Sequence, residues 1–160
     1  NRIGQIDLDD FNEVASEFDI PELHRQIDRA RDAIESDPDL AIGTAKEILE
    51  TTCKTILADH NIEYENSWEI AKLVKETRKV LGLIPNNIPS SAKGADIIQR
   101  LLSSLGSTAQ GLAELRNMYG TGHGKHGKAK GLGSRHARLA VGASSAISMF
   151  FLETHEERFL

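Results

Sequence analysis

Arg116, Asn117 and His123 carry three side chains that together can act on a phosphodiester without a metal. A guanidinium neutralises a phosphate, an amide orients it, and an imidazole, whose ordinary pKa is near neutrality, moves protons. These residues fall where a helical pattern breaks into a glycine-rich loop over 120–133. Because Gly120 and Gly122 tolerate positive φ, a turn there would bring the imidazole back beside the guanidinium. The competing interpretation is a helix C-terminus decorated with cations, which the helix dipole favours.

The charge of the chain is distributed unevenly around this motif. The net charge is -5, yet no Asp or Glu occurs between Leu115 and Leu152. A basic, glycine-rich loop in an otherwise acidic chain favours electrostatic attraction of a polyanion. We therefore expect RNA or phosphate to be bound by residues of this segment, namely Lys125, His126, Lys128, Lys130 and Arg135.

Two other kinds of site are excluded by their context. Residues 122–128 match the first seven positions of a phosphate-binding P-loop, but that motif needs a preceding strand and a Ser or Thr after its Lys. Here a helix precedes and Ala129 follows. A zinc site built from His123, His126 and His136 lacks standard spacing and has no Cys or carboxylate nearby. We therefore expect neither a metal nor a cofactor.

Composition indicates a single domain of ordinary type. The chain has 160 residues, 39% hydrophobic and 27% charged, and no apolar run as long as a membrane span requires. There is no secretory leader, and the lone Cys53 is expected to fill the core of a protein in the reducing cytoplasm. Because the chain begins at Asn1 without Met, we expect a fragment, with an upstream domain or a regulatory partner beyond it.

Helical periodicity predicts an all-α bundle of about five helices over 20–160, preceded by an acidic arm or short helix at 1–19. Side-chain caps are expected to start the helices, at Asp19, Asp37, Asn66 or Ser67, and Ser134. The expected helices end near Asp37, His60, Gly82, Met118 and Phe159, and the fourth starts near Lys93.

The helix faces give further expectations. In the fourth helix the inward residues are Ile98, Leu101, Leu102, Leu105, Leu112 and Leu115, and Gly106 and Gly111 mark a bend or a close contact. The last helix has a face of small residues from Ala137 to Ile147, suited to close packing within the chain or between two copies. His24, His60 and His155 are expected to be solvated surface groups.

Three segments carry a family resemblance: Leu115–Lys125, Arg135–Val141 and Phe151–His155. Over about 93–158 the chain resembles the C-terminal domain of bacterial abortive-infection proteins. That domain resembles the HEPN superfamily of helical nucleases, whose signature is Arg, often followed by Asn, and then His after four to six residues. Arg116, Asn117 and His123 fit this signature.

The resemblance implies a metal-independent endoribonuclease of phage defence that acts as a homodimer, with two Arg–His pairs facing each other across a shared cleft. It implies His123 as the acid or base, Arg116 as the group that stabilises charge on phosphorus, and Asn117 as a positioning group. Some related nucleases carry a Tyr two residues after the His as a target for nucleotidylation. Lys125 occupies that position here, which argues against this control.

Two non-catalytic alternatives remain open at this point. In one, the basic loop binds nucleic acid or a partner protein, and its lysines matter more than His123. In the other, the helices only dimerise an upstream sensor or effector.

Overall fold

The computed structural model describes residues 8–84, 89–119 and 133–160, with the side chains of Arg116 and Tyr119 left aside. Within these ranges the chain is helical and contains no strand, which confirms the all-α prediction. The described residues form the five helices predicted over 20–160 and, before them, the short helix that was one of two expectations for 1–19. The six are α1 (Leu8–Glu17), α2 (Pro21–Ser36), α3 (Pro38–Asp59), α4 (Ile70–Val80), α5 (Ala95–Tyr119) and α6 (Ser134–Phe159). Of the loop predicted over 120–133, residues 120–132 lie outside the described residues.

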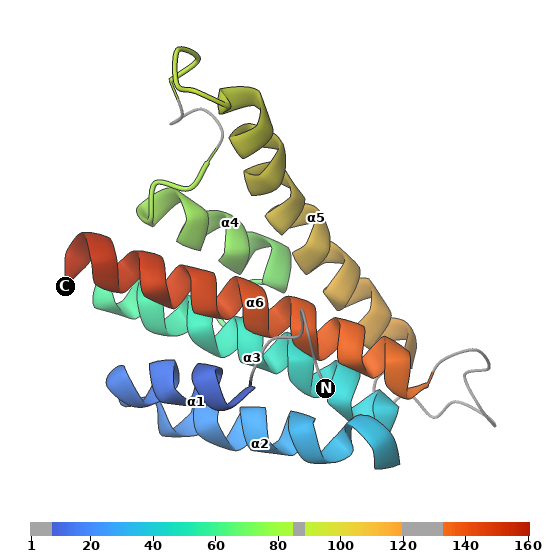
Figure 1. The fold of residues 1–160 in the computed structure, drawn as a ribbon. Coiled ribbons are helices and arrows are strands. Elements are labelled where there is room, and N and C mark those ends of the chain that lie inside the picture. The colour runs from blue at the N-terminus through green and yellow to red at the C-terminus, as the bar shows by residue number, and fades with distance from the viewer. Residues whose placement is uncertain (1–7, 85–88, 120–132) are drawn as a thin grey trace.

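The central element is α3, which packs against α2, α4, α5 and α6 (Figure 1). Ala45, Ile48 and Ile56 are fully buried, and so are Ile42 and Cys53. A helix that is apolar nearly all round is expected to lie in the interior. The other helices therefore arrange themselves around α3.

The main partner of α3 is α6, which runs alongside it in the same direction (Figure 1). The buried Ser144 hydroxyl donates a hydrogen bond to the backbone carbonyl of Ala45. Further along, His155 approaches Asp59. Such contact with a backbone carbonyl needs small side chains between the two helices. The small face of α6 thus serves packing within the chain, one of its two predicted uses.

Local signals placed some helix ends correctly and others not. Asp37 caps α3 as predicted, because its carboxylate accepts a hydrogen bond from the Leu40 amide at 3.2 Å. Asp19 does not cap α2: it has a left-handed φ of 52°, and the capping position is Ile20, with no side-chain bond. The third predicted helix starts later than expected, at Ile70, with Glu69 at its cap and no side-chain bond there. Its end at Gly82 fits the prediction, since Gly82 has a φ of 72°.

The packing of α5 differs from the predicted face. Leu102 and Leu112 are buried as expected, but Leu101 is 64% and Ile98 38% exposed, so these two do not face inward. Gly106 marks a close contact as predicted, since a Cβ there would lie 3.1 Å from the Arg78 guanidinium of α4, whereas Gly111 faces open space. The prediction failed for Leu101 because α5 contacts the bundle on one side only, along its outside (Figure 1).

At the other edge, α1 packs against α2 and α6. Phe11 and Ala15 are fully buried and belong to the same core as the other helices. Among the described residues, none of the helices combines the length and the apolar character that crossing a bilayer requires.

Candidate nucleic-acid interface

Two of the predicted catalytic residues lie on the last turn of α5. Arg116 and Asn117 are part of that helix, and the Asn117 side chain is exposed. Because it is exposed, the Asn117 amide can contact solvent or a ligand. His123 lies outside the described residues, so its distance from Arg116 stays a prediction.

The N-terminus of α6 is capped in a way that the sequence did not indicate. The capping position is Gly133 instead of Ser134, and the backbone N–H of Gly133 donates to Nδ1 of His136 at 3.1 Å. The bond satisfies a backbone donor at the start of the helix, where N–H groups have no partner within the helix. His136 therefore stabilises the first turn of α6.

Arg135 is the one predicted RNA-binding residue among the described residues. It is exposed on the first turn of α6, where no acidic residue occurs. The free N–H groups of a helix N-terminus attract anions, and the guanidinium adds to the same field. This end of α6 is thus chemically suited to a phosphate. The other four, Lys125, His126, Lys128 and Lys130, lie outside the described residues.

The end of α5 and the start of α6 lie at the same end of the bundle (Figure 1). There Arg138 of α6 forms an ion pair of 2.6 Å with Glu35, near the end of α2. Asn117 and Arg135 therefore flank the segment 120–132, which joins these two helices and contains the predicted histidine and lysines. The structure thus places the last turn of α5 and the first turn of α6 at one end of the molecule (Figure 1).

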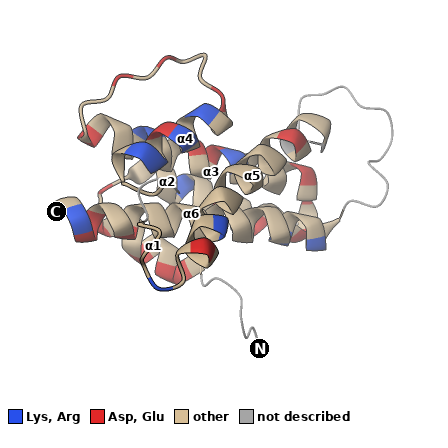
Figure 2. Cartoon of the chain, turned by 90° about the horizontal axis from the view of Figure 1, so that it is seen from above, with Lys and Arg blue, Asp and Glu red and all other residues tan. Residues whose placement is uncertain are grey.

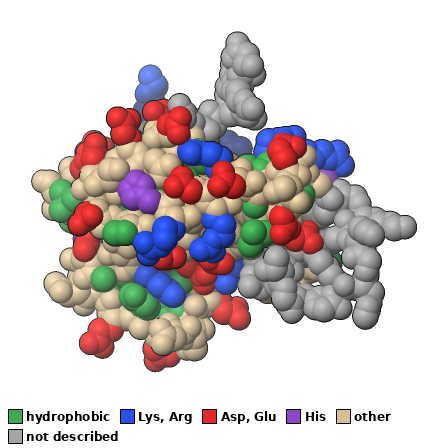
Figure 3. All heavy atoms as spheres, turned by 90° about the horizontal axis from the view of Figure 1, so that it is seen from below, with side chains coloured by type: hydrophobic (Ala, Val, Ile, Leu, Met, Phe, Trp, Pro, Cys, Tyr) green, Lys and Arg blue, Asp and Glu red, His purple; other side chains and the backbone are tan. Residues whose placement is uncertain are grey.

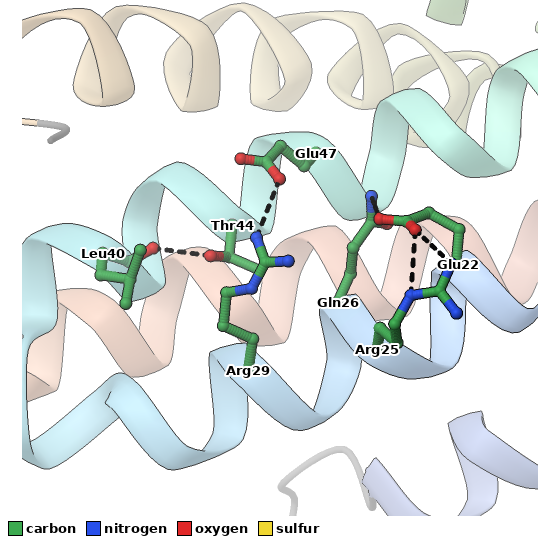
Figure 4. A network of polar contacts seen from close by, with 7 residues as sticks. All are labelled: Glu22, Arg25, Gln26, Arg29, Leu40, Thr44 and Glu47. Atoms are coloured by element: carbon green, nitrogen blue, oxygen red, sulfur yellow. Dashed lines mark hydrogen bonds and ion pairs between the residues drawn. The ribbon is translucent and has the colours of Figure 1, made fainter. Parts of the chain in front are cut away.

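The arginines of α2 have acidic partners. On α2, Arg25 pairs with Glu22 at 2.6 Å, and Arg29 reaches Glu47 at 3.4 Å (Figure 4). Arg31 pairs with Asp9 and Asp28. On the face seen from below, blue and red side chains are accordingly intermixed (Figure 3). These arginines are poor candidates for a phosphate because each already lies near a carboxylate.

At the opposite end of the bundle, the prediction that His155 is a solvated surface group was wrong. His155 is only 2% exposed, and its Nε2 lies 3.3 Å from the Asp59 carboxylate. Its Nδ1 lies 3.2 Å from Nε2 of His60, and the rings of Phe18 and Phe159 pack around it. The helical spacing from Phe151 and Leu152, both buried, was the signal that could have placed His155 inside.

Two groups at this end of the bundle have shifted pKa values, His60 within the cluster and Glu17 beside Glu156. The pKa of His60 is lowered, mainly because burial disfavours its charged form and also because His155 is near, while Asp59 acts in the opposite direction. The pKa of Glu17 is raised through its hydrogen bond and repulsion with Glu156. His24 is half-buried, and its ring contacts Asn12 at 2.8 Å and Ser16 at 3.2 Å.

Cys53 fills the core as predicted. It is fully buried, and burial raises the pKa of its thiol to about 12, so it is not a nucleophile at neutral pH. Across residues 8–84, 89–119 and 133–160, no group of His, Cys, Asp and Glu side chains is arranged to hold a metal ion.

Comparison with known families places this geometry in context. The Abi_C family, described as a HEPN-like domain, matches residues 21–155. Neither among curated proteins nor among solved structures was a match found. The family match begins at α2, well before the predicted segment 93–158, and extends into the last turns of α6. It includes both helix ends that carry Asn117 and Arg135. The chain therefore belongs to the Abi_C family of HEPN-like domains.

Proposed function

We propose that this chain is a metal-independent endoribonuclease of bacterial abortive infection, with Arg116, Asn117 and His123 as its catalytic residues. The observation that carries the proposal is the position of the motif in a HEPN-like domain. Its first two residues lie on the last turn of α5, and the exposed Arg135 opens α6 at the same end of the bundle (Figure 1).

The electrostatics of the described surface support RNA as the ligand. The arginines of α2 are paired with carboxylates, whereas α6 begins without an acidic residue and its middle is uncharged (Figure 2). The stretch from Leu115 to Leu152 contains no Asp or Glu. A polyanion would therefore approach this end of the bundle, where Lys125, His126, Lys128, Lys130 and Arg135 contact phosphates.

The chemistry follows from the residue types. RNA supplies its own nucleophile, because the 2′-OH can attack the adjacent phosphorus. His123 removes the 2′ proton or protonates the leaving 5′ oxygen, which are acid–base tasks suited to an imidazole. Arg116 stabilises negative charge on the phosphoryl oxygens, and Asn117 holds one of them. The P–O5′ bond breaks, which gives a 2′,3′-cyclic phosphate and a 5′-OH.

Cleavage of a single-stranded RNA in the presence of EDTA tests this mechanism. We expect activity in EDTA, and its loss in both His123→Ala and Arg116→Ala, with unchanged far-UV circular dichroism. An RNA with one 2′-deoxy sugar at the cut site should stay intact there and be cut elsewhere. Arg25→Ala is the matched control, because it removes a surface arginine from α2 and should keep full activity.

Two results would reject the proposal. Loss of cleavage in EDTA would show that a metal supplies the chemistry. Full activity of His123→Ala would remove the acid–base residue. If the wild type binds RNA without cutting it, and a triple Lys125, Lys128 and Lys130 to Ala variant abolishes that binding, the chain is a binding module.

A further inference from the structure

The basic side chains of α4 lack the acidic partners that the arginines of α2 have. The helix contains one acidic residue, Glu76, and four basic ones, Lys72, Lys75, Arg78 and Lys79 (Figure 2). Glu76 lies 3.6 Å from Lys79, and within the described ranges no carboxylate forms an ion pair with the other three. The surface of α4 is therefore positively charged, which favours the approach of a polyanion.

Arg78 is half-buried, whereas the three lysines of α4 are exposed. Burial lowers the pKa of its guanidinium, and no neighbouring carboxylate opposes this shift. Its Nε donates to the carbonyl of Leu83 at 3.4 Å, and its other N–H groups have no partner in the described part of the chain. These groups remain in contact with solvent. A guanidinium with free donors and no carboxylate beside it is suited to bind a phosphate through two parallel hydrogen bonds.

The middle of α5 leaves room for this guanidinium. A Cβ added at Gly106 would lie 3.1 Å from Nη1 of Arg78, so a side chain there would displace the charged group. Glycine is unfavourable inside a helix, and this close contact accounts for its presence here. Lys75 lies three residues before Arg78, on the same side of α4, and is exposed. Arg78 and Lys75 thus form a basic pair beside α5.

The contact at Gly106 lies on the same face of α5 as Asn117. The two residues are eleven positions apart, which is a sum of steps of three and four. At 1.5 Å per residue they are separated by about 16 Å along the helix axis. The one acidic residue between them in the sequence is Glu114, which is turned about 80° away from Gly106 around the helix. Its carboxylate accepts a hydrogen bond of 3.1 Å from Gln110.

We propose that Arg78 and Lys75 hold a phosphate of the RNA backbone at a site separate from the Arg116–Asn117 motif. This inference rests on the proposed function, because it takes the RNA substrate as the ligand, and it adds the path of the strand from the motif along α5 to α4. A strand advances 3.4 Å or more per nucleotide, so about 16 Å corresponds to at most about five nucleotides. The basic pair therefore contributes only to substrates that are long enough to reach it.

Cleavage of a short and a long RNA tests this site. A dinucleotide with a single phosphodiester reaches the motif alone, whereas a single-stranded RNA of about ten nucleotides spans both sites. We expect Arg78→Ala to raise KM for the long RNA about tenfold without changing kcat, and to leave kcat/KM for the dinucleotide unchanged. Arg25→Ala is the matched control, because Arg25 is already paired with Glu22, and it should alter neither substrate. An equal loss on both substrates, or an unchanged KM for the long RNA, overturns the proposal.

Direct binding separates this site from the proposed catalysis. Fluorescence anisotropy of the long RNA with the His123→Ala chain requires no cleavage. Adding Arg78→Ala should raise Kd about tenfold and reduce the slope of log K against log salt by about one, because one phosphate contact is lost. Lys75→Glu should also raise Kd, and because Lys75 is exposed the fold should be unchanged.

The outcomes distinguish the two proposals. If the wild type binds the long RNA without cutting it, and both variants weaken that binding, the site on α4 stands and the nuclease mechanism fails. If RNA is cut but neither variant changes its affinity, the strand does not contact α4, and the unpaired cations serve another ligand, such as an acidic protein. Absence of any RNA binding also overturns the site.

Discussion

Phe11→Ala tests how far α1 contributes to the stability of the domain. Phe11 is 0% exposed and lies in the common core, yet α1 precedes the residues matched by the family, 21–155. Truncating a fully buried Phe removes its apolar contacts and leaves a cavity, which costs about 3–5 kcal/mol. For a domain of this size each kcal/mol lowers Tm by roughly 2–4 °C. We therefore expect a Tm lowered by about 6–20 °C.

Urea denaturation followed by far-UV circular dichroism measures this loss, with a thermal melt as the second readout. Leu139→Ala serves as the control, because Leu139 is 70% exposed and its truncation should change the free energy of unfolding by no more than about 0.5 kcal/mol. If Phe11→Ala loses less than about 1 kcal/mol, α1 does not share the core in solution and the packing argument fails.

Two smaller perturbations probe local contacts. Asp37→Ala removes the side-chain cap of α3 and should lower the free energy of unfolding by about 1 kcal/mol in urea, whereas Asp37→Asn keeps an acceptor and should lose less; equal losses would contradict the cap. The lowered pKa of His60 means that the unfolded chain binds a proton more readily than the folded one as pH falls below its ordinary value of 6.5. Stability should therefore decrease with acid below that pH and recover above it, and His60→Gln should flatten the dependence; Glu17, with a raised pKa, acts in the opposite direction near its ordinary value of 4.5. An unchanged pH dependence in His60→Gln would exclude His60 as the source.

Capping signals in the sequence predicted a helix start correctly where the residues of a single turn determine it. Asp37 followed by Pro38 starts α3 because the cap and the fixed φ of proline act within a single turn. Asp19 carried the same signal and failed, since its left-handed conformation turns the chain between α1 and α2. That turn depends on where α1 packs, which is not a local property.

In the candidate site, too, some features could be predicted from the sequence and others depend on contacts between distant residues. The motif Arg116, Asn117 and His123 and the basic residues after it can be read from spacing and charge. The hydrogen bond from the Gly133 amide to His136 at the start of α6 could not, because a Gly–Ser start predicts a serine cap. The partners of His155 could not be predicted either: its spacing from Phe151 and Leu152 indicates burial, but Asp59, His60 and Phe18 reach it from other elements.

The sequence by itself determined the helical class, the family and the residue types available for chemistry, because periodicity, motif spacing and charge are properties of the chain in order. Only the tertiary structure decided which apolar faces are covered. Leu101 and Leu102 are neighbours of the same type, yet one is 64% exposed and the other 6%. Both are equally hydrophobic, and only the position of α3 and α4 beside α5 makes one of them part of the core.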